Sequence, residues 1–189
     1  MRSHVRSAAV ALLAAVALVA CGTDDAPAPG PANMKVRGES GALFDLTHTT
    51  WTRCESGWPY AGQSYWHAWM FGAGTATIKH EVYTASTDCT GATDPAEHFE
   101  VVMTFDPSGS DRTVGWEGTP PAGYGSTIVG TGVTFTAPAY SLTAKGVAYV
   151  DDTRTPAWIF VTNPGDTPPP PADADGYPTI LSTLEHAKL

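Results

Sequence analysis

The chain carries three cysteines, and their surroundings allow different kinds of thiol chemistry. Cys21 directly follows an apolar run near the N-terminus, whereas Cys54 and Cys89 lie in the body of the chain. A cysteine thiol can be acylated, can pair with a second thiol in a disulfide, or can bind zinc as a thiolate. The residues around each cysteine indicate which of these applies.

The first 20 residues have the layout of an export signal. Arg2 and Arg6 give a positively charged start, and residues 8–19 form an unbroken apolar run. The run is too short for a membrane-spanning helix, which needs about 20 apolar residues. Two interpretations remain: a plain secretory signal with an incidental cysteine, and a lipoprotein signal that ends at Cys21.

The segment Leu18-Val19-Ala20-Cys21 resembles the lipobox of bacterial lipoproteins. The resemblance implies that residues 1–20 are a signal peptide, that the Cys21 thiol is acylated, and that the membrane is a partner through this lipid. Two or three acyl chains give stable anchoring, whereas one gives only marginal binding. Gly22, and not an aspartate, follows the cysteine. By the same resemblance, this favours the outer membrane or cell surface of the bacterial envelope over the inner membrane.

Cys54 and Cys89 remain as an even pair, and in an exported protein such a pair predicts a disulfide. Zinc is the weaker alternative, because no histidine has finger-type spacing to either cysteine. A redox-active pair is also disfavoured, because the chain has no Cys-x-x-Cys motif. Closing the loop between the two cysteines would stabilise the fold by roughly 4 kcal/mol in the chain-entropy description.

Charge and composition set the domain plan and exclude one class of partner. Two of the 10 Lys and Arg residues lie in the signal, so the remainder has 8 basic and 19 acidic residues and is strongly acidic. Nucleic-acid binders need basic patches, so no nucleic acid is expected. Segment 21–41 is Pro- and Gly-rich without periodicity and predicts a disordered tether. One domain over 42–189 follows, including a Pro-rich loop at 163–174.

Between residues 42 and 165 the pattern predicts β-structure, because β-favouring runs alternate with Gly, Pro, Asp and Ser. Phe99, Val101 and Met103 recur at every second position, which is typical of a strand with one buried face. Turn signals such as Lys145-Gly146 separate the runs. The predicted strands are 49–53, 65–71, 76–84, 98–106, 113–117, 127–136, 140–144, 147–151 and 157–162. The predicted fold class is all-β: an antiparallel meander barrel of about eight strands, with a β-sandwich as the alternative.

Three segments resemble bacterial lipocalin-like domains and the related APCDD-type extracellular domain. They are Leu46-Thr47-x-x-Thr50-Trp51-x-x-Cys54, Val82-Tyr83-x-x-x-x-Asp88-Cys89 and Gly176-Tyr177-Pro178-Thr179-Ile180-Leu181. In the first, Thr49 stands where the family has glycine. The resemblance covers about 45–185 and implies a small β-barrel in which the two cysteines pair. It implies no assigned activity.

No motif for catalysis, a metal or a cofactor is complete. His80-Glu81 begins like a zinc-protease motif, but Thr84 stands at the position of the second histidine. Asp173-x-Asp175-Gly176 is similar to part of a calcium loop, but two of its ligand positions are wrong. His67 and His80 lie on neighbouring predicted strands and could share a metal. Without a third identifiable ligand, we interpret them as structural. The protein is therefore expected not to be an enzyme, and neither a metal nor a cofactor is expected.

Aromatic residues give the better indication of function. Trp58, Tyr65, Trp66 and Trp69 crowd into twelve positions together with Tyr60. They could form a barrel core with an aromatic rim, or the mouth of a ligand site. The first hypothesis is a non-catalytic binding module for a small apolar ligand or peptide. The second is a structural or adhesive envelope protein with a solid core, and the third, weakest, is a hydrolase. The sequence does not indicate an oligomeric state.

Overall fold

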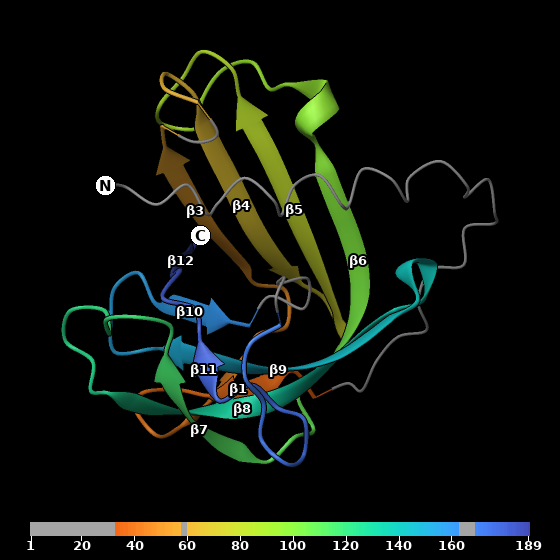
Figure 1. Ribbon diagram of the computed structural model, residues 1–189, viewed down its shortest axis with the longest axis vertical. Helices are drawn as coiled ribbons and strands as arrows, with labels where there is room; N and C mark the ends of the chain where they lie inside the picture. The colour runs from red at the N-terminus through yellow and green to blue at the C-terminus, as the bar shows by residue number, and fades with distance from the viewer. Residues whose placement is uncertain (1–32, 58–59, 163–168) are drawn as a thin grey trace.

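The computed structural model describes residues 33–57, 60–162 and 169–189, whose regular secondary structure is almost entirely β-strand (Figure 1). The short helical turns are η1 (Pro95–Glu97) and η2 (Pro138–Tyr140). Within the described ranges, no helix has the length and apolar character that a membrane crossing requires. The strands are β1 (Lys35–Arg37), β2 (Leu43–Asp45), β3 (Thr50–Ser56), β4 (Ser64–Phe71), β5 (Thr75–Tyr83), β6 (Phe99–Asp106), β7 (Asp111–Trp116), β8 (Thr127–Ala137), β9 (Leu142–Asp151), β10 (Trp158–Val161), β11 (Ile180–Leu181) and β12 (His186–Lys188).

Eight of these strands close into an antiparallel barrel. Their order is β8–β6–β5–β4–β3–β12–β10–β9, and β9 pairs again with β8. Figure 1 shows β3 to β6 side by side as long strands, with β8, β9 and β10 crossing below them. The pairing of β8 with β9 closes the sheet on itself and removes its edges. The prediction of an all-β antiparallel barrel of about eight strands is therefore confirmed over the sandwich alternative.

The predicted strands match the observed ones except near residue 146. The predicted strands 140–144 and 147–151 form one continuous strand, β9, so the turn expected at Lys145-Gly146 is wrong. A Cβ atom at Gly146 would come within 2.5 Å of Cε2 of Phe135. This glycine therefore allows an aromatic ring to pack closely against the strand, which is the other common reason for glycine inside a sheet.

Two strands of the ten-stranded sheet lie outside the barrel and cover part of its wall. β7 pairs with the first half of β8, and β11 runs parallel to β7. Alternate residues of β9 and β10 face a second apolar cluster formed with these strands, so both faces of β9 and β10 are covered. The buried members of this outer cluster are Val114, Trp116, Ile128, Val147, Tyr149, Phe160 and Leu181.

The β1–β2 hairpin belongs to the folded domain, which corrects the predicted tether boundary. The tether was expected to reach residue 41, but Met34 and Val36 are buried in the main core and β1 contacts β8 and β9. The amide of Glu39 also donates a 2.8 Å hydrogen bond to the Val150 carbonyl. Two apolar residues in a Pro- and Gly-rich segment give too weak a pattern to predict this packing.

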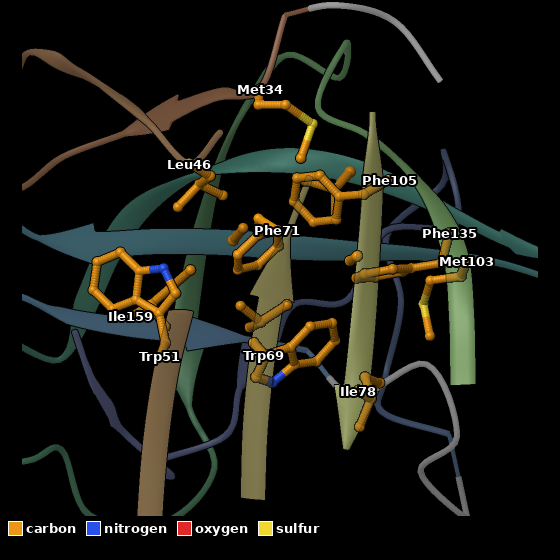
Figure 2. Packing of buried hydrophobic residues seen from close by; sticks show 14 of the residues in the cluster. Met34, Leu46, Trp51, Trp69, Phe71, Ile78, Met103, Phe105, Phe135 and Ile159 are labelled. Atoms are coloured by element: carbon orange, nitrogen blue, oxygen red, sulfur yellow. The ribbon is translucent and has the colours of Figure 1, made fainter. Parts of the chain in front are cut away.

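Large side chains fill the barrel interior. Trp51, Met103 and Phe105 are at most 1% exposed, and Phe99 packs against them from a half-buried position. Figure 2 shows the labelled aromatic side chains of β3 to β6 gathered between the strands. The centroids of the Phe105 and Phe135 rings lie 5.6 Å apart in an edge-on arrangement. These are the side chains whose packing would leave no room for a ligand deep in the barrel.

Cys54 and Cys89 form a disulfide, as the sequence predicts, with their Cα atoms 5.9 Å apart. The amide of Cys89 also donates a 2.9 Å hydrogen bond to Oγ of Ser64 at the start of β4. The disulfide therefore ties the connection between β5 and η1 to the end of the barrel where β3 finishes and β4 begins.

Replacing both cysteines, Cys54→Ser with Cys89→Ser, should lower the free energy of unfolding by about 2–4 kcal/mol. The physical reason is that the reduced chain regains the freedom of a loop with a sequence separation of 35 residues in its unfolded state. Urea denaturation of the intact protein, followed by tryptophan fluorescence without reductant, measures the change. An unchanged midpoint would show that this disulfide does not contribute to stability.

Candidate functional site

The structure separates the aromatic residues that the sequence groups together. Trp58 lies outside the described residues. Trp69 is 1% exposed and belongs to the main core. Trp66 has the opposite parity on β4, and its ring lies 5.8 Å from the Lys79 ammonium. Of the three described residues, only Tyr65 lies on the inner face of β4 beyond the closed core, with its ring 5.0 Å from that of His80.

A layer of polar side chains lies beside Tyr65 on the inner face of the barrel. We call it the polar layer and define it as Arg53, His67, His80 and His186. Cross-strand pairing sets it: Arg53 pairs with His67, and His67 pairs with His80. β12 places His186 next to Arg53, because its neighbour Ala187 pairs with Thr52. Four neighbouring strands thus bring one polar residue each to the same level.

The polar layer rests directly on the aromatic core. Side chains alternate between the two faces of a strand, so the next inward-facing residues on β3, β4 and β5 are Trp51, Trp69 and Ile78, all buried. In the other direction, the inward-facing residues are Glu55, Tyr65 and Val82. The layer therefore marks the level at which the barrel changes from a closed apolar interior to a mouth.

The three histidines contact one another directly. Nδ1 of His67 and Nε2 of His186 lie 2.8 Å apart and share a hydrogen bond. The ring of His67 also meets that of His80 edge-on, with centroids 4.2 Å apart. Because one nitrogen of the bonded pair donates and the other accepts, Nε2 of His67 and Nδ1 of His186 must carry opposite roles. The pair therefore offers one donor and one acceptor to its surroundings.

Four buried nitrogen atoms of the polar layer have no hydrogen-bond partner. They are Nη1 of Arg53, Nε2 of His67, Nε2 of His80 and Nδ1 of His186. Buried polar atoms in native proteins nearly always have partners, and each exception calls for an explanation. Four exceptions within one layer are the pattern expected of a site that receives a polar group. At least two of them, the Arg53 nitrogen and one imidazole nitrogen, are donors.

Burial keeps the three imidazoles neutral. It lowers the pKa of His80 to about 4. Burial is also the largest cause that lowers the pKa of His186 to about 3, followed by the Arg53 charge. The pKa of His67 falls to about 2, first through burial and then through the neighbouring imidazoles and Arg53. The permanent charge of the polar layer is therefore that of Arg53.

This arrangement suits an acceptor-rich or anionic group better than a cation. The carboxylate nearest to Arg53 among the described ion pairs is Glu55, whose Oε1 is 3.7 Å from Nη2 and whose side chain is 42% exposed. No group of three or more His, Cys, Asp or Glu side chains in the described ranges is arranged to hold a metal ion. Donors from an arginine and from neutral imidazoles are the chemistry that binds a carboxylate or a similar oxygen-rich group.

The described surface also carries depressions outside the polar layer. One, of about 360 Å³, is lined by Pro121, Trp158 and Glu185, among others. Arg154 in its wall donates to Asp151 at 2.7 Å and to the Ala122 carbonyl at 3.1 Å. These bonds hold the loops together, so this arginine has a structural role. A second depression, of about 460 Å³, lies between the end of β1 and the start of β8. It is also open to solvent.

The sequence pattern places two members of the polar layer, His67 and His80, on neighbouring strands, but predicts a structural role for them. His67 and His80 were paired from their predicted strands, and the third histidine was missed. His186 lies in the C-terminal tail, where a three-residue strand gives no readable period. Arg53 was passed over because its inward direction follows only from the register of β3 against β4.

No family model matches the chain, and no curated protein and no solved structure matches it either.

The neutral polar layer predicts that the protein loses stability in mild acid. The folded pKa of each histidine lies below the unfolded value of about 6.5, so the unfolded state binds more protons. The contribution of the neutral histidines to the free energy of unfolding is fully present above about pH 7. It decreases as the pH falls from 6.5 toward about 4, where His80 begins to titrate in the folded state. His80→Phe should reduce the slope by about 1.4 kcal/mol per pH unit near pH 5.

Urea denaturation at pH 7.5, 6.0 and 5.0 measures this slope. His48→Asn is the matched control, because His48 is exposed, lies outside the polar layer and has a positive φ of 57° that asparagine tolerates. The control should retain the wild-type slope. Equal slopes for wild type and His80→Phe would contradict the assignment of a buried neutral imidazole at this position.

Proposed function

We propose that the protein is a bacterial lipoprotein, held on the cell envelope through acylated Cys21, whose lipocalin-like barrel is a non-catalytic binding module for a small, largely apolar ligand or peptide. The observation that carries the binding proposal is the polar layer, in which four unpartnered buried nitrogens lie directly above an aromatic core. A polar group of the ligand would meet Arg53 and the imidazoles.

The position of the polar layer indicates where the ligand would sit. Trp51, Met103 and Phe105 occupy the interior below it, so the deep bore is already filled. Above it, Tyr65 lies against His80. At the level of the layer, Phe99 pairs with His80 across the sheet, with ring centroids 5.3 Å apart. An amphiphilic ligand could place its polar end on the layer and its apolar part along these rings at the mouth.

The filled interior also favours a second function, that of a structural or adhesive envelope protein. Such a protein needs a stable barrel and no ligand. The closed main core and the solvent-open depressions of the described surface both fit this role. The two proposals differ in one measurable respect, which is whether the barrel carries a small molecule when it is isolated gently.

Acylation is tested by substitution of the anchoring cysteine. Wild-type protein expressed in a bacterial host with a labelled fatty acid should carry the label and enter the detergent phase, whereas Cys21→Ser should do neither. The Cys54→Ser, Cys89→Ser double variant is the control and should be labelled like wild type, because its anchoring thiol is intact. Unlabelled wild-type protein in the aqueous phase would refute the anchor.

Ligand binding is tested by native mass spectrometry of the intact protein. We expect an adduct on the wild type and an at least tenfold weaker adduct on Arg53→Gln, because a hydrogen bond to a charged group contributes about 1.5–3 kcal/mol. Arg112→Gln is the matched control, since Arg112 pairs with Asp173 and Asp175 outside the polar layer. A clean apo mass for the wild type would favour the structural proposal.

A further inference from the structure

β12, which joins β3 to β10, is the shortest of the eight barrel strands and carries one of the buried histidines. β12 has three residues and pairs with β3 and with β10 through two residue pairs each. By comparison, β3 and β4 share seven residue pairs. The amide of Lys188 donates to the Ala157 carbonyl and that of Leu189 to the Thr50 carbonyl, both at 2.9 Å. The barrel is thus closed by few main-chain bonds at this point.

His186 is the residue that fixes β12 to the interior. It is 3% exposed, whereas Ala187 and Lys188 are only half-buried. Its ring meets that of His67 at a centroid distance of 4.5 Å and an interplanar angle of 80°, and the two share the 2.8 Å hydrogen bond. The strand is therefore held by a contact that requires at least one of two neighbouring imidazoles to be neutral.

Arg53 and the neighbouring His80 oppose protonation of His186, whereas the backbone contact with Leu184 favours it less strongly. β3 contributes Arg53 and, further out, Glu55; β4 contributes His67 and Tyr65; β5 contributes His80; and Glu185 precedes His186 in the chain. β10, from Trp158 to Val161, contributes no titratable side chain. Among the described ion pairs, none joins a carboxylate to His67, His80 or His186. A proton on His186 would therefore lie beside the Arg53 cation without a compensating charge.

We propose that β12 is a pH-sensitive latch, which closes the barrel at neutral pH through the His186–His67 hydrogen bond and separates from β3 and β10 in mild acid. This inference goes beyond the proposed function and does not depend on a bound ligand. Separation of β12 from β3 and β10 would expose the polar layer and the gap between these two strands above the aromatic core. The low pKa values of His67 and His186 in the closed barrel agree with it, because a proton is accepted more readily in the open state.

The size of the effect follows from the ordinary pKa of an exposed histidine. If opening exposes His186 and restores a pKa of about 6.5, the open fraction rises about 30-fold between pH 7.5 and 5.0. Freeing His67 at the same time would increase this factor further. The remaining barrel strands keep their pairing, so the change should be local.

Hydrogen exchange with mass spectrometry tests the latch in the intact protein. The readout is the protection of the C-terminal peptide containing the Lys188 and Leu189 amides, corrected for the pH dependence of intrinsic exchange. In wild type, protection of this peptide should fall at least about 30-fold from pH 7.5 to 5.0. At pH 5.0 it should be lower than that of peptides from β8 and β9, which exchange only when the barrel unfolds. His186→Gln keeps a side-chain amide to bond His67 without a titrating group, and should lose most of the pH dependence.

Two further variants keep the test decisive. His67→Gln removes the other end of the same hydrogen bond and replaces His186→Gln if that variant fails to fold, as judged by circular dichroism. His48→Asn should behave like wild type. The proposal is overturned if the C-terminal peptide has equal corrected protection at both pH values. It is also overturned if the C-terminal peptide is as well protected as β8 and β9 at pH 5.0, or if the glutamine variants keep the wild-type pH dependence.

Discussion

Closure of the sheet is the constraint on which the rest of this structure depends. The long strands β3 to β6 present an aromatic inner face that only a complete barrel can cover, and the cover is supplied from three different parts of the chain. β8 and β9 supply one wall, the β1–β2 hairpin segment buries Met34 and Leu46 against it, and β12 joins β3 to β10. Because β12 is so short, the position of lowest pairing in the barrel coincides with the position of its most buried histidine.

The polar layer follows from this architecture, because four neighbouring strands each place one polar side chain at the same level of the barrel. A barrel of this size is filled by side chains, and on β3 and β4 the filling changes from tryptophan to a polar residue between successive inward-facing positions. Neutral imidazoles tolerate such a level because they can hydrogen-bond to one another, as His67 and His186 do. Arg53 is the exception, since its charge lies next to neutral rings, its carboxylate partner Glu55 is 3.7 Å away and half-exposed, and its buried Nη1 has no hydrogen bond. Its presence is the reason for assigning function, and not merely packing, to this level of the barrel.

Much of the fold could be predicted from the sequence because period-2 alternation is a local signal. The alternation in β6 and the pairing of Cys54 with Cys89 were both correct. The predictions were wrong or incomplete where structure depends on distant partners. Gly146 resembles a turn residue in the sequence, but it is needed because the Phe135 ring packs against it. Met34 and Val36 lie in a segment that resembles a tether, and only their contacts with distant strands reveal that they are core residues. His186 could not be assigned to the site because its level depends on the register of a three-residue strand against β3.

The path of the chain through the β1–β2 hairpin gives the domain a direction. Met34 enters the core near Phe71 and Phe105, at the far end of β4 from Ser64 and the disulfide (Figure 2). The inward-facing residues of β4 run from Tyr65 beside the polar layer to Phe71 at this entry point. A domain tethered by its N-terminus would thus stand on the end that the hairpin closes. The opposite end of the barrel, which carries Tyr65 and the disulfide, would then lie farthest from the surface to which the domain is tethered.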